Sequence, residues 1–311
     1  MGKSKEEITA ALKSQGWQNE DIEHGFTSTA SGIPLPLNQD LPKAGEIFKE
    51  AWGIYKARFK TLIAINLIPI ASMLSLAVIF GIYFGVKISN IGGQTGQAII
   101  FAILAILFIA AIIFIIYISV WSTVAQIVAI KYHTELIGWK ESYKRSRNKI
   151  NQFFSTNLLA GLAVGGVAVL GVLTFVALLL LKNSIGLPVS FIVGALLAIA
   201  VIVAIVNLSL KLSQTSYVVV EDDLANIAAL KRSSYYVKKR LGKVFGKLFY
   251  LGIITFGLYI GLVVVLGIFN ALTHTDPNFT NWITNVFSFI WTPMTIAYGY
   301  LLYKHLKATR P

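Results

Sequence analysis

Charged residues and cysteine are scarce in this 311-residue chain. It has no cysteine, which excludes disulfides, thiolate metal ligands and cysteine nucleophiles. Only 13% of its residues are charged, against about 25% in soluble domains, whereas 56% are apolar and the mean hydropathy is +0.70. A chain with so little polar surface would aggregate in water, so we expect a lipid bilayer to cover its exterior.

Catalytic signatures are also missing. The sequence contains no Walker A loop, no His-Glu-x-x-His pair and no Gly-x-Ser-x-Gly nucleophile elbow. Its four histidines are scattered, although a metal site needs three or four converging ligands. We therefore expect no enzymatic activity, no cofactor and no metal. The densest acidic cluster, Glu221 to Asp223, is expected to be a solvated turn, with a divalent-cation site as the less favoured alternative.

Six long apolar stretches dominate the chain, at residues 61–86, 98–130, 156–181, 189–220, 248–272 and 282–303. Each exceeds the ~20 residues that cross a bilayer. Backbone amides cannot stay unpaired in hydrocarbon, so each stretch predicts a transmembrane α-helix. The predicted fold class is an all-α, polytopic integral membrane protein. Its transmembrane domain covers residues 43–307, after a small cytoplasmic helical hairpin at 1–27, with helices at 5–14 and 19–26, and a flexible linker at 28–42.

The distribution of positive charge predicts the orientation. Of the 27 Lys and Arg residues, 24 lie before residue 61, at 131–153, at 221–247 or after residue 303. The positive-inside rule then places both termini in the cytoplasm and makes the protein a multi-pass protein of the cell (plasma) membrane. Because the charge follows one membrane surface, we expect anionic membrane lipids as partners and no nucleic acid.

The basic segments that precede the odd-numbered spans resemble one another. Aligned on Lys49, Lys144 and Lys231, they recur after 95 and then 87 residues. This spacing suits one unit, an amphipathic interfacial helix followed by a helical hairpin, used three times, although a chance match stays open. The alternative for the cations in these segments is that they only anchor and orient the spans. Eleven of them are candidate anionic-lipid contacts: Lys49, Lys56, Arg58, Lys144, Arg145, Arg147, Lys231, Arg232, Lys238, Lys239 and Arg240.

Uncharged polar residues inside the spans are candidates for a polar, cytoplasm-facing vestibule. They are Ser122, Thr123, Gln126, Ser213, Gln214, Thr215, Thr292 and Thr295. Pro293 would free the carbonyl of Phe289 for a ligand or a water molecule. The alternative is that these groups form hydrogen bonds between helices. Gly-x-x-x-Gly pairs at 81 and 85, 161 and 165, and 257 and 261 predict close helix packing in the odd spans.

Three short motifs carry a resemblance to a known family. They are EIFKEAW at 46–52, ALKRS at 229–233 and LLYKHLK at 301–307. They resemble the six-helix membrane domain of bacterial glycerophosphoryl diester phosphodiesterases and its stand-alone relatives, over about residues 43–307. The family follows its final tyrosine with an acidic and a basic residue, whereas this chain has Lys304 and His305, so a role of that acid does not carry over. Residues 6–22 are similar to short ubiquitin-associated-like segments.

Two functions follow as expectations. The first is a non-enzymatic scaffold or lipid-interacting module at the cytoplasmic leaflet, with residues 1–27 available to a cytoplasmic protein partner, because the resembled family keeps its phosphodiesterase activity in a separate barrel domain. The alternative is a permease or lipid translocator that uses the polar vestibule. Continuous, tightly packed helices with no cavity beside Gln126 and Gln214 would count strongly against the second.

Overall fold

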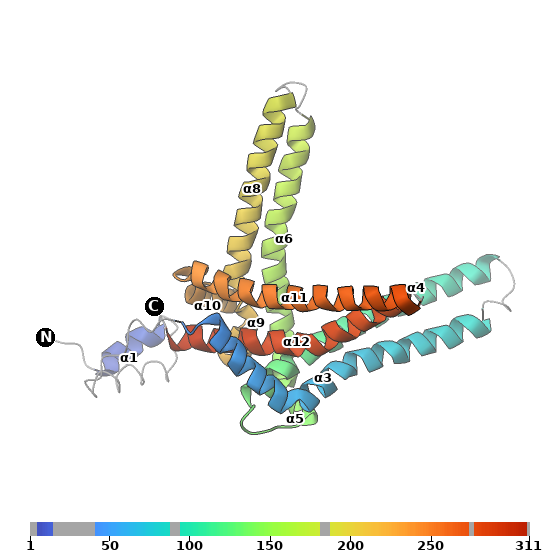
Figure 1. The fold of residues 1–311 in the computed structure, drawn as a ribbon, viewed down its shortest axis with the longest axis horizontal. Helices are drawn as coiled ribbons and strands as arrows, with labels where there is room; N and C mark the ends of the chain where they lie inside the picture. Colours follow the sequence, from blue (N-terminus) through green and yellow to red (C-terminus); the bar gives the residue numbers. More distant parts are fainter. Residues whose placement is uncertain (1–4, 15–40, 88–93, 181–186, 274–276, 310–311) are drawn as a thin grey trace. The chain divides into compact units, whose positions relative to one another are not determined.

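The computed structural model describes residues 5–14, 41–87, 94–180, 187–273 and 277–309, and every regular element in them is a helix (Figure 1). The chain divides into two compact units, Met1–Leu41 with Ala308–Pro311, and Pro42–Lys307. The first contains α1, Lys5–Ser14, at the position of the first helix expected near the N-terminus. The second expected helix, 19–26, and nearly all of the linker lie outside the described residues.

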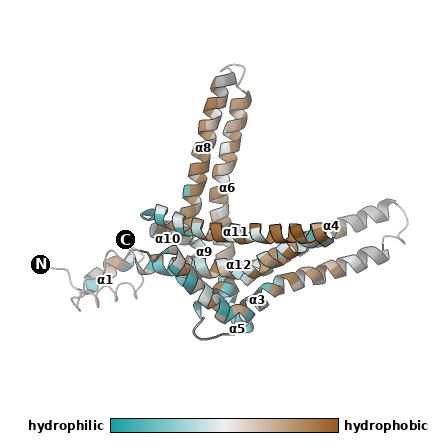
Figure 2. Cartoon of the chain, in the orientation of Figure 1, coloured by the Kyte–Doolittle hydropathy of each residue, from teal (hydrophilic) through white to brown (hydrophobic). Residues whose placement is uncertain are grey.

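Five helical segments of the second unit are long and apolar enough to cross a membrane. They are built on α3 (Ala44–Lys87), α4 (Gln94–Lys131), α6 (Ile150–Leu180), α8 (Leu187–Leu212) and α11 (Leu241–Thr273). At most 11% of the most apolar window of each segment is buried, and Figure 2 shows hydrophobic residues along most of their length. Apolar surface of this extent marks contact with lipid, as expected of a membrane protein.

The helix predicted as the sixth span is α12, Pro277–Ala308, which is not among those five. Its 32 residues are enough to cross a bilayer. It is less apolar than the others because it contains four threonines and, in its second half, Tyr298, Tyr300 and Tyr303. These tyrosines are buried. Much of the helix is therefore adapted to protein contacts in addition to any contact with lipid.

The fourth predicted span is interrupted. Residues 189–220 were expected to form one helix, but α8 ends at Leu212 and a separate helix, α9 (Thr215–Glu221), follows a turn at Ser213 and Gln214. The turn leaves the Lys211 carbonyl without its usual helical N–H partner. The Ser233 hydroxyl donates to that carbonyl at 2.7 Å, which satisfies the group that the turn exposes.

Short helices precede two of the long ones. In the middle of the chain, α5 (Trp139–Ser146) continues through the 3₁₀ turn η1 (Arg147–Lys149) into α6, and α10 (Asn226–Lys238) precedes α11. The corresponding residues at the start of the unit are continuous with the first long helix in α3. We call the end of the unit formed by residues 43–60, 131–153, 221–247 and 298–307 the basic end. Hydrophilic residues of α5 and α10 stand out there in Figure 2.

The packed core lies at the basic end. Residues 105–117 of α4 are mostly exposed, whereas residues 124–130 of the same helix are buried on all sides. Residues 218–220 of α9 and 300–303 of α12 are buried as well. The helices therefore pack against one another at the basic end, while their central parts offer side chains to lipid.

The described glycines of the expected pairs do not lie at close contacts, and the surroundings of Gly85 lie outside what the structure describes. A Cβ added at Gly161, Gly165, Gly257 or Gly261 would meet no other heavy atom within 4 Å, and the same holds for Gly81. Close approaches occur elsewhere in the described residues. A Cβ on Gly171 would lie 2.7 Å from Val201 Cγ1, and one on Gly299 would lie 2.8 Å from Tyr217 Cζ.

Candidate functional site

Pro69 of α3 leaves a backbone carbonyl available to side chains of other helices. A proline has no N–H, so Pro69 leaves the carbonyl of Ile65, four residues earlier in α3, without its helical partner. Two side chains from other helices bond to that carbonyl. The Ser122 hydroxyl of α4 donates to it at 3.2 Å, and the Tyr143 hydroxyl of α5 donates at 3.1 Å. The proline therefore serves to connect three helices.

Pro293 of α12 repeats this arrangement. It frees the carbonyl of Phe289, which was expected to be available to a ligand or water. The structure shows a different outcome, because Asn66 Nδ2 of α3 donates to this carbonyl at 2.8 Å. The oxygen of the same amide accepts a bond of 2.7 Å from Gln126 Nε2 of α4. One amide thus connects α3, α4 and α12.

The Tyr55 hydroxyl of α3 adds a further bond to this junction, because it donates to the Ile290 carbonyl of α12 at 2.8 Å.

The sequence analysis did not identify Asn66 or Pro69. Their signal was present, since a carboxamide and a proline stand three residues apart within the first apolar stretch. A buried amide in a span needs partners from neighbouring helices, and a proline supplies an unpaired carbonyl for such a partner.

Asp222 lies at the centre of the basic end. It is 4% exposed and follows the last residue of α9. Its Oδ1 accepts a bond of 2.8 Å from the Tyr303 hydroxyl and one of 2.6 Å from Lys307 Nζ. Its Oδ2 accepts a bond of 3.2 Å from the Tyr236 hydroxyl. Arg232 Nε lies 3.9 Å from Oδ2 as well, so the carboxylate is buried with two cations and two phenols, which together offset the loss of its hydration.

The neighbouring acids make further contacts at the same end. Glu221 lies 3.1 Å from Lys131 Nζ of α4 and accepts a bond of 3.2 Å from Tyr300 of α12. Asp223 lies 2.5 Å from Lys149 Nζ of η1. The expectation of a solvated turn is wrong for Asp222, which is buried, whereas Asp223 is exposed to solvent. No group of three or more metal-ligating side chains occurs in the described residues.

The expected vestibule residues occupy several environments. Ser122 and Gln126 belong to the junction with α3, as described above. Thr123 donates to the Ser119 carbonyl of its own helix at 3.0 Å. Ser213, Gln214 and Thr215 form the turn between α8 and α9. There Gln214 Oε1 and Thr215 Oγ1 are buried without a hydrogen-bond partner in the described part of the chain.

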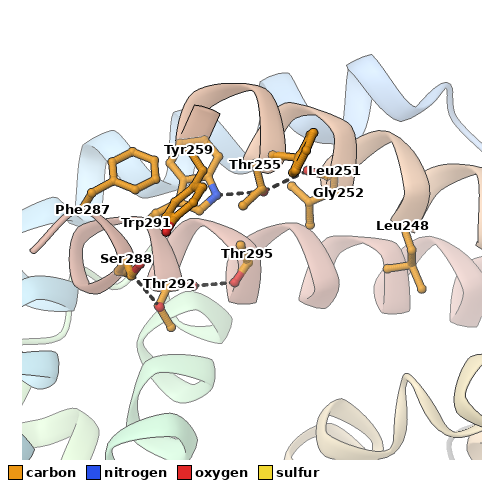
Figure 3. A pocket seen from close by; sticks show the side chains of 11 residues that line it. Leu248, Leu251, Gly252, Thr255, Tyr259, Phe287, Ser288, Trp291, Thr292 and Thr295 are labelled. Carbon is orange, nitrogen blue, oxygen red and sulfur yellow. Dashed lines mark hydrogen bonds between the residues drawn. The ribbon is translucent and has the colours of Figure 1, made fainter. Parts of the chain in front are cut away.

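Thr292 and Thr295 line a groove between α11 and α12 (Figure 3). The groove has a volume of about 540 Å³, and neither Gln126 nor Gln214 lines it. Leu248, Leu251, Gly252, Thr255, Phe256 and Tyr259 form its α11 wall, and Phe287, Ser288 and Trp291 complete its α12 wall. The eight predicted vestibule residues are thus distributed over α4, the α8–α9 turn and this groove.

Most of the basic residues expected to contact lipid are exposed. These are Lys49, Lys56, Lys144, Arg145, Arg147, Lys231, Lys238 and Lys239. Arg58 departs from the expectation, because it is 3% exposed and its guanidinium donates to the carbonyl of Ile137. It therefore ties α3 to the α4–α5 connection and is not available to lipid.

Three arginines are less free to meet lipid than the exposed lysines. Arg145 forms ion pairs of 2.9 Å with both Glu135 and Glu141. Arg232 donates to the Tyr236 hydroxyl at 2.9 Å and is only partly exposed, as is Arg240. The cations open to a membrane surface are therefore mainly lysines.

Compared with models of known protein families, with curated proteins and with solved structures, the chain matches none of them. Its function must be argued from its own geometry. Three features carry that argument: the exposed lysines of the basic end, the internally bonded junctions beside Pro69 and Pro293, and the groove between α11 and α12.

Proposed function

We propose that this protein is a non-enzymatic, six-span protein of the cell membrane whose basic end faces the cytoplasm and binds anionic lipid headgroups, acting as a scaffold at that leaflet. The single observation that carries the proposal is the exposure of lysines on each of the three basic segments. Lys49 and Lys56 lie on α3, Lys144 on α5, and Lys231 on α10. Each lysine near an anionic leaflet contributes ~1 kcal/mol of attraction.

Burial supports the threefold repeat that would present these lysines together. Positions two residues before, two after and six after each aligned lysine lie four residues apart, on one helix face. All nine are buried: Ile47, Ala51 and Tyr55 in the first segment, Ser142, Ser146 and Ile150 in the second, and Ala229, Ser233 and Val237 in the third. The three segments therefore bury the same face when aligned as the sequence suggests.

Equivalent contacts support the same alignment. Ser146 accepts a bond of 2.9 Å from Trp121 Nε1 of α4, and Ser233 at the matching position donates to α8. The second and third segments thus contact the second helix of the preceding hairpin. The first segment contacts the last hairpin, because Glu50 lies 3.2 Å from His305 of α12. This cyclic order supports the proposed pseudo-threefold bundle.

The scaffold is supported better than a permease. A permease with a polar vestibule was expected to have a cavity beside Gln126 and Gln214, and neither residue lines the groove between α11 and α12. Side-chain bonds instead use Ser122 and Gln126 to hold α4 against α3, while Thr292 and Thr295 line a separate groove. The resemblance to the phosphodiesterase membrane domain agrees with a role in which the membrane part carries out no chemistry.

The test is a comparison of lipid binding with and without exposed lysines. Delipidated protein in detergent is titrated with phosphatidylglycerol or phosphatidylcholine, and bound lipid is counted by native mass spectrometry. Replacing Lys231, Lys238 and Lys239 by Gln should weaken phosphatidylglycerol binding by up to about 100-fold at low salt, since three cations supply ~3 kcal/mol. Salt should reduce this difference.

The matched control replaces Lys3, Lys5 and Lys13 by Gln, which removes the same charge outside the second unit. This control should bind phosphatidylglycerol like the native chain. Equal losses in the two triple variants would show that only net charge matters. No preference of the native protein for phosphatidylglycerol over phosphatidylcholine would refute the proposed function.

A further inference from the structure

The groove between α11 and α12 has the size and extent of a lipid-chain site. Its volume of about 540 Å³ falls within the ~300–1,000 Å³ typical of small-molecule sites. Along α11 it runs from Leu248 to Tyr259, which is about 16 Å at a rise of 1.5 Å per residue. One leaflet is half of a ~30 Å hydrocarbon core, so the groove matches the length of one acyl chain.

The walls of the groove offer little to a polar ligand. Four hydroxyls in the lining donate to carbonyls of their own helices: Thr255 to Leu251, Ser288 to Thr284, Thr292 to Ser288 and Thr295 to Thr292, at 2.8–3.0 Å. The indole N–H of Trp291 donates to Thr255 Oγ1 at 3.0 Å (Figure 3). These five donors are already bonded inside the protein, and Tyr259 adds one further hydroxyl. The other contacts are aromatic and aliphatic, which suits a hydrocarbon chain.

Charge at one end of the groove complements a lipid phosphate. The groove begins one residue after Lys247, the last charged residue of α11. Five of the ten residues from 238 to 247 are Lys or Arg, and Lys238 and Lys239 are exposed. A hydrocarbon groove that starts beside a basic stretch of the chain has the polarity of a phospholipid, with an anionic head followed by an apolar tail.

We propose that the α11–α12 groove binds one acyl chain of an anionic phospholipid whose phosphate lies against residues 238–247. This rests on the proposed function and deepens it, because it converts a general attraction to the leaflet into one defined lipid site. The lipid would be retained when the protein is extracted, since its tail is held by the groove walls in addition to its headgroup.

Gly252 provides the test. It lines the groove, and a Cβ added there would meet no atom within 4 Å, so a larger side chain can grow into the groove without moving the backbone. Gly257 is the matched control, because a Cβ there also meets no atom within 4 Å but the residue does not line the groove. Gly252→Phe should lower the retention of the tightest phosphatidylglycerol at least tenfold in native mass spectrometry. Gly257→Phe should leave retention unchanged.

Photo-cross-linking locates the bound acyl chain on the native protein, so the result does not depend on whether a variant folds. Native protein is incubated with phosphatidylglycerol carrying a diazirine on its acyl chain, and labelled peptides are identified after irradiation. We expect labels on Phe256, Tyr259 or Phe287, which line the groove. Unlabelled phosphatidylglycerol should compete for this labelling more strongly than phosphatidylcholine.

Three results would overturn the site. Equal lipid retention in Gly252→Phe and Gly257→Phe, or labels spread evenly over all helices, would show that the groove holds no defined chain. A dimer mass lost on Gly252→Phe without loss of lipid would identify a second copy of the chain as the occupant. The Lys231, Lys238 and Lys239 variant separates the failures: if it still weakens lipid binding, headgroup binding stands and only the groove is refuted.

Discussion

Replacing Asn66 tests whether its side-chain amide takes the place of the backbone N–H that Pro293 lacks. Replacing it by Leu, which has a similar shape, removes the donor to the Phe289 carbonyl and the acceptor of Gln126. Hydrogen bonds within membranes contribute ~0.6 kcal/mol on average, and an abandoned buried carbonyl costs ~1–3 kcal/mol. We expect Asn66→Leu to lower the free energy of unfolding by about 2 kcal/mol.

The second arm restores a partner by another route. Pro293→Ala supplies a backbone N–H at residue 293 that can bond to the Phe289 carbonyl, so Asn66 is no longer its required donor. In that background Asn66→Leu should cost only the bond to Gln126, ~0.6 kcal/mol. The two substitutions should therefore couple by about 1.4 kcal/mol in a double-mutant cycle.

The assay is reversible unfolding in mixed micelles, with SDS as the denaturant and tryptophan fluorescence as the signal. Thr292→Val combined with Asn66→Leu is the matched control, because Thr292 adjoins Pro293 but donates to Ser288 of its own helix. That pair should be additive within ~0.5 kcal/mol. Additivity of Asn66→Leu with Pro293→Ala would refute the idea that the amide replaces the N–H that proline lacks.

Other parts of the structure predict further outcomes. Asp222→Ala removes the acceptor of Lys307, Tyr303 and Tyr236, and should lower the unfolding free energy by ~3 kcal/mol in the same assay. Asp223 is exposed, so Asp223→Ala should lower it by under ~1 kcal/mol. Equal losses in the two variants would contradict a stabilising role of the buried Asp222 carboxylate. Gly299→Ala places a Cβ 2.8 Å from Tyr217 Cζ and should cost ~1–3 kcal/mol, partly recovered by Tyr217→Leu, while Gly257→Ala should be neutral. Single cysteines, free of any native thiol background, should react with impermeant reagents from the cytoplasm at 140 and 231 and from outside at 90 and 184; the reverse pattern would invert the topology. Deleting residues 1–40 should leave that labelling pattern unchanged, because residues 43–60 keep their lysines.

Hydrophobicity predicted the long helices well, because an apolar run long enough to cross a bilayer must pair its own backbone amides and therefore forms a helix. Five of the six expected spans are long and apolar enough in the structure, and α12 falls short through its tyrosines and threonines. Interruptions were harder to foresee. The turn at Ser213 and Gln214 contains neither glycine nor proline, and it depends on Ser233, which lies in a different helix.

The polar contacts could be predicted only in part. Composition identified Gln126 and Ser122 as noteworthy, but their partners depend on which carbonyls the prolines free and which helices lie adjacent. The burial of Arg58 and Asp222 was not predictable from local sequence, because neighbouring charges on the same segments are exposed. Exposed and buried charged residues therefore cannot be distinguished from the local sequence alone, because burial depends on tertiary contacts.

The bonding of Asp222 has a consequence for biogenesis. This carboxylate emerges from the ribosome 85 residues before Lys307, one of its two cationic partners, and 81 residues before Tyr303. The other cation, Arg232, and the Tyr236 hydroxyl belong to α10 and follow within 14 residues. The contacts from α10 can therefore form first, and the cluster around Asp222 is completed only after α12 has been made.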